Sequence, residues 1–139
     1  MDKNIGKRIT EAFFGILFNL LFYYILNRFY SLVPFLTEDF EKILPIYNLS
    51  IMVSISFHAS RILFSSRIYK DIGDIISTGF FIYIAYLLWI VFPFNLEWFN
   101  NTALWNIIIR FLIVIPPFFA FLGAFITFLK TIFEINKKE

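Results

Sequence analysis

The chain has 139 residues, of which 60% are hydrophobic and only 16% are charged, and phenylalanine alone occurs 21 times. Proteins that fold in water carry about 25% charged residues, so this composition excludes an ordinary soluble domain and favours a protein whose solvent is the lipid bilayer. The net charge of +2 is too small to indicate nucleic-acid binding, and the absence of cysteine excludes disulfides, thiolate nucleophiles and cysteine-bound metals.

Apolar stretches long enough to cross a bilayer follow one another along the chain. We expect an all-α, polytopic integral membrane protein, with one domain covering residues 1–139 and four transmembrane helices in an antiparallel bundle. The expected spans are about residues 9–30, 49–67, 75–92 and 111–129.

The connection between the first two spans, residues 31–48, contains a pattern typical of a short helix. Thr37 is a suitable N-cap, and acidic residues follow it in the first turn. Apolar residues recur on one helical face, at Leu36, Phe40, Ile43 and Leu44. We therefore predict a short helix here, lying along the membrane interface between the first two spans.

The second half of the chain has clear boundary signals. The polar stretch before Ile75 predicts a short turn, and Pro93 ends the third span. Asn101 or Thr102 is available to cap the fourth helix, whose charge-free segment lies between Arg110 and Lys130. The Pro116–Pro117 pair predicts a kink near its middle.

The positive charges indicate the orientation. Eight basic residues fall on the side of the two termini: Lys3, Lys7, Arg8, Arg67, Lys70, Lys130, Lys137 and Lys138. Three fall on the other side, namely Arg28, Lys42 and Arg110. By the positive-inside rule we expect both termini in the cytoplasm, with the protein in a bacterial inner membrane.

The expected second span, residues 49–67, carries a stripe of polar residues. On a helix these residues lie within an arc of about 80°: Ser50, Ser54, His58, Arg61 and Ser65. Facing lipid they would cost several kcal/mol, so the stripe should face protein or a small wet cavity. For Arg61 we weigh two interpretations, an ion pair with Asp74 and simple snorkelling to the interface. His58 is expected to be a structural residue satisfied by a neighbouring helix, with a hydrogen bond to Tyr83 geometrically reasonable. The alternatives for His58 are a haem ligand, a quinone-binding group or a proton relay.

The fourth helix carries small residues at spacings that allow close helix packing: Ala120, Gly123, Ala124 and Thr127. We expect them to pack mainly against the polar helix within the molecule, and an oligomer interface is the alternative.

The sequence contains no paired carboxylates inside a span, no nucleophile beside a base and no Gly-rich phosphate loop. We therefore expect no catalytic activity, cofactor or metal, and a protein that works through helix–helix contacts with another integral membrane protein or with itself. The organisation is similar to that of immunity proteins against pore-forming bacteriocins, without a shared motif, and an accessory subunit fits equally. Two other classes stay open. One is an oligomeric channel or proton pathway along the polar stripe, and the other is a quinone- or haem-binding anchor of a redox complex.

Overall fold

The computed structural model describes residues 3–137, and within them every regular element is helical. The long helices are α1 (Lys3–Phe29), α2 (Leu44–Ser60), α3 (Arg67–Val91) and α4 (Thr102–Asn136). Short 3₁₀ helices occupy the connections: η1 (Tyr30–Leu32), η2 (Glu38–Lys42) and η3 (Leu96–Trp98). The all-α prediction is confirmed.

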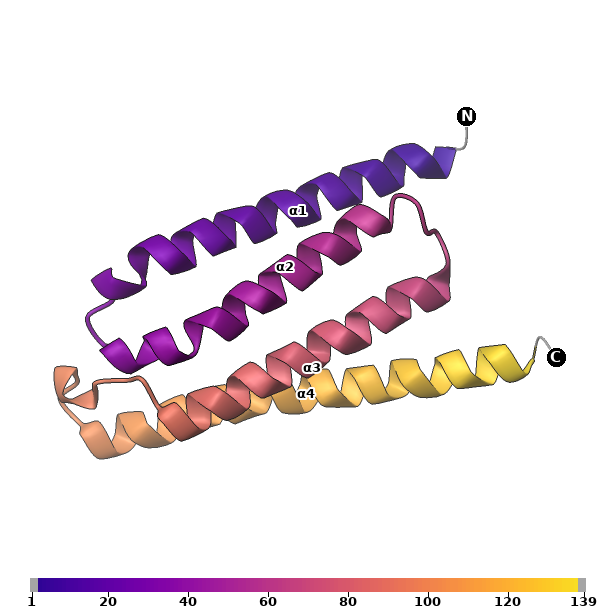
Figure 1. Cartoon of the computed structure of the whole chain (residues 1–139). Helices are drawn as coiled ribbons and strands as arrows, with labels where there is room; N and C mark the ends of the chain where they lie inside the picture. Colours follow the sequence, from indigo (N-terminus) through magenta and orange to yellow (C-terminus); the bar gives the residue numbers. More distant parts are fainter. Residues whose placement is uncertain (1–2, 138–139) are drawn as a thin grey trace.

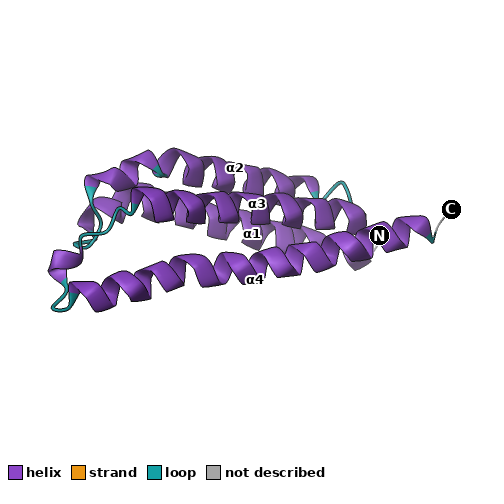
Figure 2. Cartoon of the chain, turned by 90° about the horizontal axis from the view of Figure 1, so that it is seen from below, coloured by secondary structure: helices purple, strands orange, loops and turns teal. Residues whose placement is uncertain are grey.

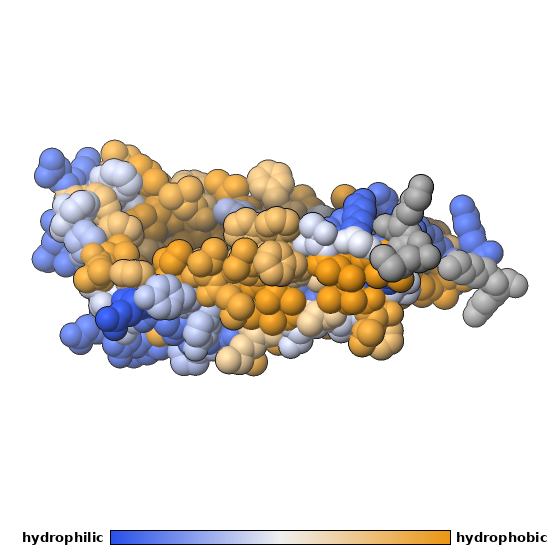
Figure 3. Space-filling view, turned by 90° about the horizontal axis from the view of Figure 1, so that it is seen from above, coloured by the Kyte–Doolittle hydropathy of each residue, from blue (hydrophilic) through white to orange (hydrophobic). Residues whose placement is uncertain are grey.

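Three helical segments are long and apolar enough to cross a membrane: Asn4–Leu32, Arg67–Val91 and Thr102–Asn136. Their apolar side chains point mostly outward, since few are buried. The buried hydrophobic residues include Ala12, Phe40, Ile43, Ile51, Ile84 and Ile113. Figure 3 shows hydrophobic residues across the middle of one face and hydrophilic residues toward both ends. This distribution fits an integral membrane protein.

The helices pack in chain order. Consecutive helices run antiparallel, and the extensive contacts are those of α1 with α2, α2 with α3 and α3 with α4 (Figures 1 and 2). Within residues 3–137, α1 and α4 lie at opposite edges and do not pack extensively on each other. The arrangement is therefore a curved layer with an open side rather than a closed four-helix bundle.

The molecule has two distinct ends, which we name by what they hold. The terminal end contains the start of α1, the α2–α3 connection and the end of α4, and the loop end contains the other two connections (Figure 1).

Helix α2 differs from the predicted second span, which was about residues 49–67. It begins at Leu44, and Pro45 occupies the first turn. Proline is tolerated there because a backbone N–H at this position would have no partner within the helix. It ends at Ser60, and Arg61 to Phe64 form a turn. Its 17 residues make it the shortest of the four, about 25 Å long.

Helix α3 begins at Arg67, eight residues before the predicted start at Ile75. The polar stretch that predicted a turn forms the first two turns of the helix. Two of its polar side chains contact α4: Arg67 Nη1 lies 2.8 Å from Glu134 Oε1, and Thr131 Oγ1 donates to Asp71 Oδ2 at 3.0 Å. Gly73 is buried here, because a Cβ at this position would lie 3.0 Å from the Phe57 ring of α2.

Helix α4 extends beyond the predicted span at both ends, and it continues as a helix through Pro116 and Pro117. The predicted N-cap at Asn101 is confirmed, since its Oδ1 accepts a hydrogen bond from Leu104 N at 3.1 Å.

The predicted interfacial helix is instead the 3₁₀ helix η2, and its apolar residues face inward. Phe40 is buried, and Ile43, which follows the helix, is fully buried. Thr37 stands at the N-cap position with extended backbone but makes no cap bond through its side chain. This segment packs into the loop end of the molecule.

A short backbone bridge joins the two connections at the loop end. Thr37 N donates to Pro93 O at 2.9 Å, and Asn95 N donates to Phe35 O at 2.8 Å, so Leu36 pairs with Phe94 as an isolated antiparallel bridge. Phe92, the residue after α3, turns the chain toward this bridge in the left-handed conformation, with φ 43°. The bridge ties the α1–α2 hairpin to the α3–α4 hairpin.

Candidate functional site

The predicted polar stripe is divided by the end of α2. Its middle members, Ser54, His58 and Arg61, line a small cavity together with residues at the start of α3, among them Asp74. We call this the polar cavity. Its volume is about 40 Å³, which is room for about one to three water molecules. Ser50 does not line it, and Ser65, in the α2–α3 connection, lines a different cavity at the terminal end.

His58 packs against α1. A Cβ added to Gly15 would lie 2.4 Å from His58 Nδ1 and 2.5 Å from its Cε1, so the ring occupies the space that a larger residue would fill. The predicted His58–Tyr83 hydrogen bond is wrong, because Tyr83 is 47% exposed and lies beside the Tyr86 ring instead. In the sequence, Gly15 within the first expected span is the feature that could have indicated this contact.

Arg61 faces α1 as well. Its Nη2 atom lies 4.0 Å from Glu11 Oε2, whereas Asp74 lines the same cavity without coming within ion-pair distance. The predicted Arg61–Asp74 pair is therefore wrong. Because α2 ends at Ser60, Arg61 lies in the turn after the helix, where its side chain can extend toward the first turns of α1.

Two asparagines join α1 to α2 nearer the loop end. Asn27 Nδ2 donates to Asn48 Oδ1 at 2.7 Å, and Asn48 Nδ2 donates to Asn27 Oδ1 at 3.0 Å. Paired amides of this kind satisfy each other away from water, and such interhelical bonds contribute about 0.6 kcal/mol on average in membrane proteins.

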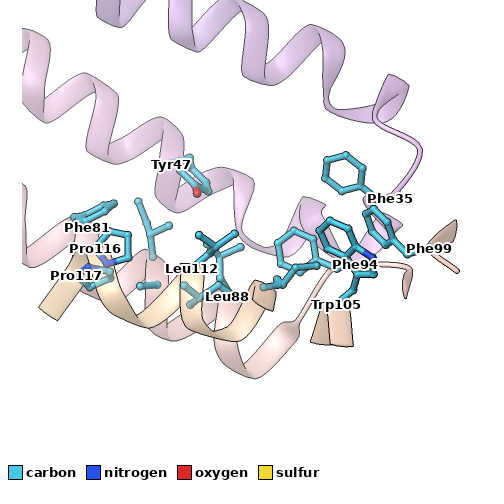
Figure 4. Close-up of a pocket in the computed structure, with 14 residues that line it drawn as sticks. Phe35, Tyr47, Phe81, Leu88, Phe94, Phe99, Trp105, Leu112, Pro116 and Pro117 are labelled. Carbon is cyan, nitrogen blue, oxygen red and sulfur yellow. The ribbon is translucent and has the colours of Figure 1, made fainter. Parts of the chain in front are cut away.

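A larger, apolar cavity of about 480 Å³ lies toward the loop end. Figure 4 shows Tyr47 of α2, Phe81 and Leu88 of α3, and Leu112 and Pro116 of α4 around it. Aromatic residues of the connections and the start of α4 complete its wall: Phe35, Phe94, Phe99 and Trp105. His58, Arg61 and Tyr83 do not line this cavity.

The small residues of α4 separate into two groups. Ala120, Ala124 and Thr127 are half-buried, and they lie on the side of α4 whose buried residues, such as Ile113, face α3. This side of α4 packs against α3, whereas we expected these residues to pack against the polar helix. Gly123 is exposed, and nothing lies within 4 Å of a Cβ built on it.

Gly123 shares a face with residues of the apolar cavity. At about 100° per residue, Leu112, Pro116 and Gly123 fall within an arc of about 40° around α4. Leu112 and Pro116 line the apolar cavity beside α2, so Gly123 continues that face toward the terminal end. We call these three residues the open face of α4.

The loop end also holds a half-buried contact between a cation and two aromatic rings, which sequence reasoning missed. The Arg110 guanidinium lies 4.6 Å from the centre of the Trp89 ring and 4.5 Å from that of Phe92, and its Nε donates to Asn106 Oδ1 at 2.8 Å. Stacking on two rings lets a charged group remain near the apolar belt.

The geometry defines a small all-helical protein in which three helices are long and apolar enough to cross a membrane. Within residues 3–137, no group of three or more His, Cys, Asp or Glu side chains is placed to hold a metal ion. No protein-family model, curated protein or solved structure matches the chain.

Proposed function

We propose that this protein acts in a membrane by binding another integral membrane protein through helix–helix contacts, without catalysing a reaction. The observation that supports this proposal is Gly123, an exposed glycine on the open face of α4 with no neighbour of its own. A glycine lets a second helix approach closely, and close packing is what drives helix association in lipid.

The proposal includes the topology. Helix α2 lies antiparallel between α1 and α3 and contains no charged residue other than a protonatable His58, so we take it as a fourth, short span. The terminal end carries Lys7, Arg8, Arg67, Lys70, Lys130 and Lys137, and the loop end carries Arg28, Lys42 and Arg110. This asymmetry favours cytoplasmic termini, as in a bacterial inner membrane.

Reporter fusions test the topology. A fusion after Lys70 should give a cytoplasmic signal, and fusions at Glu41 and Asn100 should give external signals. A cytoplasmic signal at Asn100 would contradict the four-span topology.

Partner binding can be tested with single cysteines, because the chain has none of its own. A cysteine-reactive benzophenone on Gly123→Cys should crosslink a membrane protein in native membranes. Gly79→Cys is the matched control, since Gly79 also has open space around it but lies about 140° around α3 from the cavity-lining Ile84.

The crosslinking result decides between the outcomes. An adduct from position 123 and none from position 79 supports the proposal, and an adduct of twice the 16.6 kDa chain mass identifies a second copy as the partner. Equal labelling at both positions, or none, would refute it. The identity of a distinct partner separates the two roles we consider: a subunit of a larger complex indicates an accessory subunit, and a toxin or its receptor indicates an immunity protein.

The alternatives receive less support. The polar cavity of about 40 Å³ is confined to the terminal half of the α2–α3 contact, which is too small and too local to support a continuous ion path in one copy. The apolar cavity has the size for a flat ligand such as a quinone, but none of the groups expected to bind one lines it.

A further inference from the structure

Another cavity, distinct from the polar cavity described above, has a volume of about 460 Å³ and lies at the terminal end. It lies between the first turns of α1, the α2–α3 connection and the start of α3, and we call it the basic cavity. Its lining residues are Asn4, Lys7, Arg8, Glu11, Ser65 and Lys70. We propose that this basic cavity binds the phosphate of an anionic phospholipid headgroup. The proposal is independent of partner binding at α4.

The charge balance of the basic cavity favours an anion. Three of the six lining residues are cations and one is a carboxylate. Glu11 is shared between Lys7, at 3.9 Å, and Arg61, at 4.0 Å, so its charge is already offset by a cation from the α2–α3 connection, outside the cavity lining. Within the described part of the chain, neither Arg8 nor Lys70 has a carboxylate within ion-pair distance.

Arg8 is held in the cavity without its full set of hydrogen bonds. Its side chain is half-buried, and its Nε atom is buried with no hydrogen-bond partner in the structure. The Arg8 side chain lines the cavity, and a phosphate oxygen is the acceptor that a guanidinium binds best. Lys70 from α3 and the Ser65 hydroxyl add donors from two other segments, so the cavity presents cations and a neutral donor to one centre.

The depth of the cavity favours a lipid over a soluble anion. Residues 12–27 of α1 and 75–91 of α3 contain no charged side chain, and the cavity lies at the terminal-end border of both stretches. The headgroup layer begins where the charge-free segments end. With the topology proposed above, the terminal end is cytoplasmic. Basic pockets between transmembrane helices on the cytoplasmic side are typical sites for anionic headgroups.

Lipid binding to the whole purified protein tests this site. Native mass spectrometry in a neutral detergent measures the affinity for phosphatidylglycerol, with phosphatidylcholine and inorganic phosphate as comparison ligands. Wild-type protein should bind phosphatidylglycerol in preference to phosphatidylcholine, and inorganic phosphate should not compete. If inorganic phosphate competes equally, the site binds a small soluble anion and the lipid assignment is wrong.

The variants distinguish a specific phosphate-binding site from a general effect of positive charge on lipid binding. Arg8→Gln with Lys70→Gln should weaken phosphatidylglycerol binding roughly thirtyfold, which corresponds to about 2 kcal/mol for two basic residues near the surface. Lys70→Gln alone should weaken phosphatidylglycerol binding about fivefold. Lys70→Arg keeps the positive charge and should bind like the wild type. Lys70→Gln alone serves if the double variant fails to fold.

The control is Lys130→Gln, which removes an exposed cation from α4, a helix that does not line the cavity. It should leave affinity within about twofold of the wild type. An equal loss in Lys130→Gln and Lys70→Gln would overturn the proposal, because binding would then follow overall charge. Far-ultraviolet circular dichroism and gel filtration establish that each variant is folded.

Discussion

Replacing Gly15 by alanine should damage the α1–α2 contact. The added Cβ would lie 2.4, 2.5 and 2.7 Å from three atoms of the His58 ring, and all of these distances are shorter than atoms tolerate. Either the imidazole must move by about 1 Å or the two helices must separate, and overpacking of this kind typically costs about 1–3 kcal/mol. The same substitution in an open helical position would stabilise the protein by up to about 1 kcal/mol, since alanine is the better helix former.

The measurement is reversible unfolding in mixed detergent micelles, followed by tryptophan fluorescence. Gly15→Ala should lower the free energy of unfolding by about 1–3 kcal/mol. Gly6→Ala on the same helix is the control, because a Cβ at Gly6 meets nothing within 4 Å. It should leave stability unchanged or slightly raised.

A double variant isolates the contact. His58→Ala removes the ring, so Gly15→Ala should cost much less in that background than in the wild type. The reasoning would be refuted if Gly15→Ala were as stable as the wild type, or if its cost were the same with and without His58.

Other contacts lead to smaller expected effects. In a double-mutant cycle, Arg61→Gln and Glu11→Gln should show a small favourable coupling of about 0.2–1 kcal/mol, because both side chains are partly exposed at 29% and 51%. Strictly additive losses would contradict the ion pair. Thr131→Val should lower the free energy of unfolding by about 1 kcal/mol, because the Thr131 hydroxyl donates to Asp71. Thr131→Ser keeps the hydroxyl and should retain most of that stability. Equal losses in the two variants would assign the effect to packing. Asn101→Ala removes the N-cap of α4 and should cost about 1 kcal/mol, with the start of that helix exchanging its amide protons faster; unchanged exchange would contradict the cap.

Composition and hydropathy were sufficient to predict the membrane class and the helical content, because a bilayer leaves few choices to a chain this apolar. Helix ends were predicted less well, and at the starts of α2 and α3 the segment concerned contains a residue with two uses. Pro45 can end a helix or start one, and Gly73 can form a turn or allow two helices to approach closely. The start of α3 also contains charged groups, which predict a loop until Glu134 and Thr131 of α4 are placed beside them.

The polar site was predicted in part. Ser54, His58 and Arg61, which the helical spacing placed on one stripe, line one cavity in the structure. Their partners were predicted wrongly, since periodicity describes one helix and says nothing of which neighbour it faces. The Gly15 contact and the Glu11 ion pair both belong to α1, and the preference for α1 over α3 depends on tertiary packing that a single sequence does not contain.

The order of packing along the chain has a consequence for how the protein is made. Each helix contacts mainly the helix synthesised just before it, so every new span leaving the insertion machinery finds its neighbour already in the membrane. The bridge between Thr37 and Pro93 is the exception, since it joins residues more than fifty positions apart and can close only after α3 has been inserted. A chain stopped at Val91 should therefore hold its first three helices in their final contacts, but the bridge between Thr37 and Pro93 would not form. Because Pro93 and Asn95 are synthesised before α4, the bridge at the loop end can form before α4 packs against α3.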